Sequence, residues 1–161
     1  WFPHSSIVGI EINPRARRIA TRRVASDPRA SVSSPKSLSG AFDVIFALAV
    51  FQREPVKVEE MEISDLSEIY PFERFDAAVS RLVNLLRPRV RLRVANTQYR
   101  IEDSLVALEL EPIRGAPIAS NHLFGRDGRR LRAASACAMF RRRRQKSWPV
   151  GKRIRRTVGK I

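Results

Sequence analysis

The sequence predicts an α/β fold built on a mostly parallel sheet. A β-branched run at 7–12 leads directly into a helix signal, and an unbroken apolar run occupies 44–51. The segments expected along the chain follow the order β-α-β-loop-β-α-β, which is typical of strands joined by crossover helices. The 161 residues suffice for one domain with a hydrophobic core.

The first strand and helix are indicated by residue type and spacing. Isoleucine and valine dominate 7–12, which favours a strand, and Asn13 followed by Pro14 is a typical helix start. The apolar spacing predicts a helix over 14–24, with its arginines on a solvated face. Glu11 then lies near the carboxyl end of the strand, the edge where open α/β sheets bind ligands.

The next segments follow from composition. "ASVS" at 30–33 is expected to be a short strand, and 34–40 has the composition of a loop. The run at 44–51 has so few polar positions that we expect a strand buried on both faces. We further expect 7–12, 44–51 and 90–94 to be parallel strands with adjacent carboxyl ends.

The second half of the chain contains the clearest helix. Phe75, Val79, Leu82 and Leu86 repeat at helical spacing, which predicts a helix over 71–88 between two prolines. "VRLRVAN" alternates apolar and basic residues, as a strand does. Three further segments are expected to be an acidic connection with some helix at 53–70, a strand or helix at 104–113, and one or two strands at 122–131.

Charge divides the sequence unevenly. The net charge is +15, but residues 1–131 carry 20 Lys/Arg and 16 Asp/Glu, whereas 132–161 carry 11 Lys/Arg and no acid. We therefore expect a domain at 1–131 and a basic, poorly ordered tail at 132–161. The tail, which includes Trp148, is expected to make non-specific contacts with nucleic-acid phosphates. The alternatives are a solvated extension and translation past the natural stop or out of frame.

Several classes of protein are disfavoured by composition. Cys137 is the only cysteine, so no intrachain disulfide can form, and a reducing, cytoplasmic location is expected. No signal peptide is visible, and the longest apolar run, 44–51, is too short to cross a membrane. His4 and His122 have no further ligands at metal-binding spacing, so no metal site is expected.

Four segments, taken in order, resemble a bacterial class I S-adenosylmethionine-dependent methyltransferase domain. They are "IVGIEINPRARRIA", "FDVIFALAVFQ", "FDAAVSRLVNLLRP" and "NTQYRIEDS", and the resemblance covers about 6–131. It implies a Rossmann-like sheet, S-adenosylmethionine as cofactor, and methyl transfer to an unidentified acceptor. No catalytic residue is assigned, because methyl transfer from a sulfonium needs positioning more than acid–base groups.

The resemblance also implies a cofactor site. Glu11 would hold the ribose hydroxyls, Ile12 would pack on the adenine, and Ser34 would lie near the adenine amino group. Phe46 and Ala47 would line the methyl-donor pocket, largely through their backbone.

A substrate site is expected beyond the strand at 90–94. Asn96, Tyr99 and Arg100 follow this strand, at the edge of the sheet where substrate would enter. The alternative is ordinary loop polarity, and the sequence favours neither.

Two departures from the family stand out. The family's glycine-rich loop precedes the acidic strand, and this sequence starts 10 residues before Glu11. We therefore expect an N-terminally truncated domain that lacks part of the cofactor site, binds S-adenosylmethionine weakly or not at all, and is impaired as an enzyme. Arg89 and Arg91 stand where the family usually has glycines, so the geometry of that turn is in question.

Two other functions compete with this one. A nicotinamide-dependent Rossmann oxidoreductase also uses an acid at the end of the second strand, although no Tyr-x-x-x-Lys pair is present. The other alternative is a basic RNA-binding protein that acts through its tail.

Overall fold

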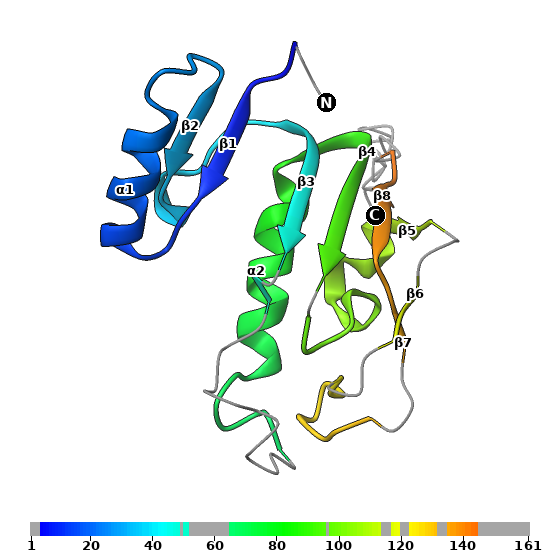
Figure 1. The fold of residues 1–161 in the computed structure, drawn as a ribbon. Helices are drawn as coiled ribbons and strands as arrows, with labels where there is room; N and C mark the ends of the chain where they lie inside the picture. The colour runs from blue at the N-terminus through cyan, green and yellow to red at the C-terminus, as the bar shows by residue number, and fades with distance from the viewer. Residues whose placement is uncertain are drawn as a thin grey trace, which may run out of the picture. The chain divides into compact units, whose positions relative to one another are not determined.

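The structure is a computed structural model that describes residues 4–48, 50–51, 65–95, 97–113, 117–119, 123–131 and 135–144. Figure 1 shows the course of the chain. The chain divides into two compact units, 1–40 and 41–161, which we call the N-terminal and C-terminal units.

The N-terminal unit is a small β-α-β arrangement. Strand β1 (Ile7–Ile10) and strand β2 (Ala30–Ser33) pair in parallel, with Ile10 opposite Ser33, and helix α1 (Pro14–Val24) connects them (Figure 1). A 3₁₀ turn, η1 (Pro35–Ser37), follows β2. The two strands and the helix confirm the elements expected from the sequence.

Helix α1 begins where the sequence predicts. The side chain of Asn13 accepts hydrogen bonds from the backbone N–H of Arg15 at 2.9 Å and of Ala16 at 3.3 Å. Pro14 occupies the first turn, where its missing N–H costs nothing. Because the chain must leave the strand to form this cap, β1 ends at Ile10 and not at Ile12.

The C-terminal unit contains a mixed four-stranded sheet in the order β3-β4-β8-β5. Strand β3 pairs with β4 in parallel, and β8 is antiparallel to both of its neighbours. Its elements are β3 (Phe42–Leu48), α2 (Phe72–Asn84), β4 (Leu86–Ala95), η2 (Ile101–Asp103), η3 (Leu105–Glu109), β5 (Leu110–Pro112), β6 (Pro117–Ala119), β7 (Ser135–Cys137) and β8 (Met139–Arg142).

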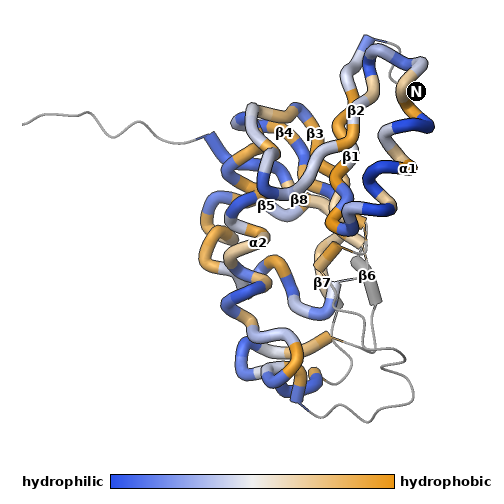
Figure 2. The backbone as a smooth tube through the Cα atoms, turned by 90° about the vertical axis from the view of Figure 1, so that its left-hand side faces the viewer, coloured by the Kyte–Doolittle hydropathy of each residue, from blue (hydrophilic) through white to orange (hydrophobic). Residues whose placement is uncertain are grey.

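Helix α2 packs against one face of this sheet. Phe75 and Val79 on the helix are fully buried, and so are Leu92 on β4 and Phe140 on β8, which belong to the same hydrophobic core. Figure 2 shows how hydrophobic and hydrophilic positions alternate along α2, the pattern of a helix with one face on a core.

The helix predicted over 71–88 is shorter in the structure. It ends at Asn84, and Leu86 already pairs with Phe42 as the first residue of β4. Pro88 explains the difference, because a proline disfavours the helical conformation of the residue before it. Leu86 is nevertheless buried, as its spacing from Phe75 suggested. It reaches the core as a residue of the sheet and not as a residue of the helix.

The prediction that 44–51 is buried on both faces is wrong. Strand β3 lies at an edge of its sheet, and Val44, Phe46 and Leu48 are 40%, 52% and 55% exposed. Within β3 the alternate residues Ile45 and Ala47 face the core, as does Phe51 beyond the end of the strand. An apolar run is compatible with burial on both faces of a strand. It does not show that a second layer of helices packs against the other face of the sheet. Since β1 belongs to the N-terminal unit, its predicted place in one sheet with β3 and β4 stays a prediction.

Part of the segment predicted as a tail after residue 131 belongs to the sheet. Strand β8, from the segment expected to be a tail, is hydrogen-bonded between β4 and β5, and Phe140 is only 1% exposed. Ala136 and Ala138 are buried as well. Ten of the eleven basic residues of 132–161 lie at 141–161, so the overall charge of the segment concealed the small apolar residues that precede them. Residues 145–161 lie outside the described part of the chain.

Candidate functional site

Glu11 lies immediately after β1, in the turn that leads into α1. Its backbone N–H donates to the carbonyl of Ser33 at 3.2 Å, which keeps it beside the end of β2. One carboxylate oxygen, Oε1, accepts the backbone N–H of Asn13 at 2.8 Å, and Arg17 donates to the Glu11 carbonyl at 2.9 Å. The turn therefore fixes the carboxylate at the carboxyl ends of two parallel strands, while Oε2 has no partner among the described residues.

Ile12 and Ser34 belong to the same end of the N-terminal unit. The Ile12 side chain is 74% exposed, so it offers an apolar surface next to Glu11. Ser34 follows β2 and starts η1, where its Oγ accepts the backbone N–H of Ser37 at 3.2 Å and lies 2.8 Å from the Ser37 Oγ. The structure thus brings Glu11, Ile12 and Ser34 together at the ends of β1 and β2.

Phe46 and Ala47 lie on β3, in the C-terminal unit, with opposite orientations. The Ala47 side chain is buried against α2, so only its backbone could line a site, as the resemblance implied. Phe46 is exposed on the other face of the sheet.

Tyr99 does not line an open site, in contrast to the sequence expectation. Its side chain is fully buried, and its ring centroid lies 5.3 Å from those of both Phe72 and Phe75. Its hydroxyl donates to the carbonyl of Tyr70 at 2.6 Å. Tyr99 is therefore a core residue whose hydroxyl is already satisfied. Asn96, the first residue of the expected substrate site, lies outside the described residues.

Burial of Tyr99 predicts a loss of stability at high pH. Desolvation, reinforced by the nearby charge of Asp65, raises the pKa of Tyr99 to about 12. An unfolded tyrosine has a pKa of about 10, so between these values the unfolded chain releases a proton that the folded chain keeps. The contribution of Tyr99 to the free energy of unfolding is fully present below about pH 10. The free energy of unfolding should fall by about 1–2 kcal/mol as the pH rises toward 12. Urea titrations from pH 8 to 12 should show a larger fall in the wild type than in Tyr99→Phe, in which only Tyr70, whose pKa burial also raises, remains. A Tyr70→Phe control should keep most of the wild-type fall. Parallel curves for the wild type and Tyr99→Phe would contradict it.

Arg100 is tied to its own 3₁₀ turn. Its Nε and Nη2 donate to the two oxygens of Asp103 at 2.9 and 2.7 Å, a two-point ion pair that raises the pKa of Arg100. Its side chain is still 38% exposed. Arg100 could bind a ligand only if this ion pair were broken. The structure therefore gives Arg100 a local structural role, and its role in substrate binding stays a prediction.

Comparisons with known proteins bear on the fold. The crystal structure of the N-methyltransferase NodS from Bradyrhizobium japonicum WM9 superposes with a TM-score of 0.50 at 15% sequence identity. The match covers 86% of this chain and 74% of NodS. The chain therefore resembles NodS in fold. No family model matches the sequence, and no curated protein matches it.

The NodS match supports the α/β class and the parallel strand pairs that the sequence predicted. The described chain is a mixed α/β structure whose β1–β2 and β3–β4 pairs are parallel, as a Rossmann-like methyltransferase fold requires. At this identity the likeness concerns the fold alone, and NodS is described only as an N-methyltransferase.

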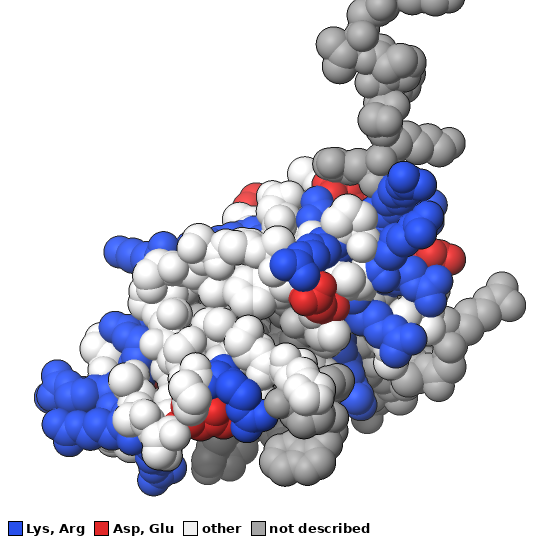
Figure 3. Space-filling model, turned by 90° about the horizontal axis from the view of Figure 1, so that it is seen from above, with Lys and Arg blue, Asp and Glu red and all other residues white. Residues whose placement is uncertain are grey.

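The sequence did not predict that one group of charged residues lies together. Arg89, Arg91, Arg141 and Arg144, which we call the arginine group, line a hollow of about 560 Å³ together with Arg142, Arg143 and Glu111. Figure 3 shows basic side chains gathered on part of the surface, with acidic side chains between them. The alternation of arginine and apolar residues at 89–94 was a signal for one exposed strand face, but nothing in the sequence placed Arg141 beside it.

Two further findings limit the chemistry of the described residues. No three His, Cys, Asp or Glu side chains within them are grouped so that they could hold a metal ion. None of the helices in the described ranges is long and apolar enough to span a bilayer.

Proposed function

We propose that the chain is an S-adenosylmethionine-dependent methyltransferase domain, with Glu11, Ile12 and Ser34 on the nucleoside part of the cofactor. The observation that carries the proposal is the place of Glu11, a carboxylate that follows a parallel strand and precedes a crossover helix. The methyltransferase-like fold supports it. The resemblance found in the sequence segments gives the same residues the same roles.

The residues of the N-terminal unit fit the adenosine half of the cofactor. A ribose diol needs hydrogen-bond acceptors, and one carboxylate oxygen of Glu11 has no partner among the described residues. An adenine ring needs an apolar surface, which the exposed Ile12 side chain offers. When bound, the cofactor supplies a methyl group activated on a sulfonium, and these residues bind and orient its nucleoside end.

The proposal is tested by NMR titration of the ¹⁵N-labelled chain with S-adenosylhomocysteine. The contacts assigned above are few, so the titration should cover dissociation constants near 1 mM, which correspond to a binding free energy of about −4 kcal/mol. We expect shifts at Glu11, Ile12 and Ser34. Glu11→Gln should weaken binding by about 10- to 100-fold, the effect of losing hydrogen bonds to a charged group.

The control is Asp27→Asn, which makes the same carboxyl-to-amide change in the same unit. Asp27 lies before β2, where it pairs with Arg29 at 3.0 Å, so it is at the opposite end of the strands from Glu11. It should leave the titration unchanged. Shifts caused by NADH and absent with S-adenosylhomocysteine would favour the oxidoreductase alternative, and no shifts at Glu11 and Ile12 with either ligand would refute the cofactor site.

A further inference from the structure

The four-stranded sheet has one face that α2 does not cover. Alternate residues of a strand point to opposite faces, and the residues that α2 buries are Ile45, Ala47, Leu92, Val94 and Phe140. The open face therefore carries the residues between them. In strand register they form two rows, Val44–Arg91–Arg141–Glu111 and Phe46–Arg93–Met139.

Positive charge on this face is poorly compensated. Arg91 and Arg141 are directly opposite each other on neighbouring strands, an arrangement that is destabilising for like charges. No member of the arginine group has an ion-pair partner within 4.0 Å among the described residues, and Glu111 is the one acid that lines the hollow. The fold therefore holds a cluster of arginines together without neutralising it.

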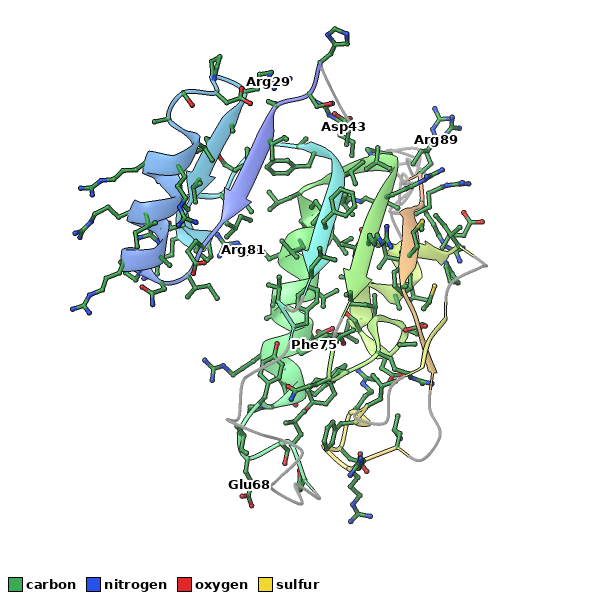
Figure 4. The ribbon with its side chains drawn as sticks, viewed as in Figure 1. Arg29, Asp43, Glu68, Phe75, Arg81 and Arg89 are labelled. Atoms are coloured by element: carbon green, nitrogen blue, oxygen red, sulfur yellow. The ribbon has the colours of Figure 1, made fainter. Side chains whose placement is uncertain are left out.

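Arg89 adds a conformational cost to the electrostatic one. Its φ is +69°, in the left-handed region that costs an L-residue about 1–2 kcal/mol and that glycine adopts freely. Figure 4 shows its side chain pointing away from the ribbon at the start of β4, beside β8. A strained backbone that carries a long cationic side chain at a charged hollow is an indication of a functional residue.

The arginine group is separate from the edge of its own sheet that holds the carboxyl ends of its parallel strands, where the resemblance implies the methyl-donor pocket. Arg91 is opposite Val44, near the amino end of β3, whereas the carboxyl ends of the parallel pair lie at Leu48 and Ala95. Four residues of strand, about 13 Å, separate these two edges. A ligand on the arginine group therefore does not have to be the methyl donor.

The chemistry of the open face selects a partner. Guanidinium groups bind phosphates through paired hydrogen bonds, and the basic residues that line the hollow are all arginines. No described residue that lines the hollow is apolar and able to insert into a lipid surface. Phe46, 52% exposed and paired with Arg93, offers a ring on which an unpaired base could stack.

We propose that the open face of the four-stranded sheet binds single-stranded nucleic acid. The arginine group contacts successive phosphates, and Phe46 stacks on one base. Arg142 also lines the hollow, and its side chain is held in place because it pairs with Glu109 at 3.3 Å and donates to the Leu86 carbonyl.

The test is fluorescence anisotropy of the full chain with a labelled oligouridylate of about 16 nucleotides, a length sufficient for one such surface. The triple variant Arg89→Gly, Arg91→Gln, Arg141→Gln should lose at least about tenfold in affinity at about 0.15 M salt. The slope of log affinity against log salt should become shallower by about 2, because three phosphate contacts are removed. Its melting temperature should not fall, since the substitutions remove a left-handed arginine and a like-charge pair.

Two comparisons make the result specific. The triple variant Arg15→Gln, Arg18→Gln, Arg22→Gln removes the same charge from exposed positions on α1, and its affinity should stay within about threefold of wild type. Phe46→Ala should weaken oligouridylate binding about tenfold without changing the salt slope, because stacking releases no counterions.

Three results would overturn the proposal. The first is an equal loss in the α1 variant, which would mean diffuse charge attraction. The second is binding of a DNA duplex as tight as that of the single strand, since a paired base cannot stack on Phe46. The third is tighter binding to phosphatidylserine vesicles than to oligouridylate, which would identify a membrane surface.

Discussion

Phe140→Ala should lower the free energy of unfolding of the C-terminal unit by about 3–5 kcal/mol. Phe140 is 1% exposed, and its strand is hydrogen-bonded on both sides, so neither β4 nor β5 can move in to fill the space left by the ring. Urea denaturation followed by circular dichroism measures the loss.

Phe46→Ala is the matched control for this substitution. It removes the same ring from the same sheet, but from a side chain that is 52% exposed, and should cost less than about 1 kcal/mol. Equal losses in the two variants would mean that β8 is not part of the folded sheet, as the boundary predicted at 131 requires.

Gly128→Ala should destabilise the same unit by about 2–4 kcal/mol. Gly128 has a φ of +78°, and an added Cβ would lie 2.7 Å from the backbone N of Ser67 and closer still to the Asp65 carboxylate. The segment cannot retreat, because the Gly128 carbonyl accepts the N–H of the fully buried Leu66 at 2.8 Å.

Gly125→Ala, in the same loop, separates this effect from a general intolerance of alanine. Its φ is not positive, and the nearest described atom to its added Cβ is Oδ1 of Asp127, at 2.8 Å, which is the end of a side chain and not backbone. We expect a loss below about 1 kcal/mol. If both variants unfolded at the same urea concentration, the tight approach at Gly128 would not be a determinant of stability.

Local signals in the sequence predicted the elements whose causes are local. The Asn13–Pro14 pair defined the start of α1, because a cap and a first-turn proline act within four residues. The parallel pairing of 44–48 with 91–95 followed from strand composition and an intervening helix. The position of Glu11 beside β2 is also a consequence of that local β-α-β order.

Features that depend on distant residues were not accessible in the same way. Tyr99 looked like a polar loop residue, but its hydroxyl partner is 29 positions away and its neighbouring rings lie on α2. Arg91 and Arg141 are 50 positions apart and meet only through the register of β4 and β8. The sequence did not indicate a strand at 139–142, because Arg141 and Arg142 are both basic and adjacent. In the structure Arg141 is at an exposed position, whereas Arg142 pairs with Glu109.

The insertion of β8 between β4 and β5 has a consequence for the order of folding during synthesis. The 43 residues between Ala95 and Met139 must be translated after β4 and before its second neighbour exists. At about 5–20 residues per second this takes roughly 2–9 s, far longer than a helix or hairpin needs to form. Over that interval the emerging chain presents β4 with one unpaired edge, so a ribosome stalled before Met139 would hold a nascent chain that is open to chaperones and to misfolding.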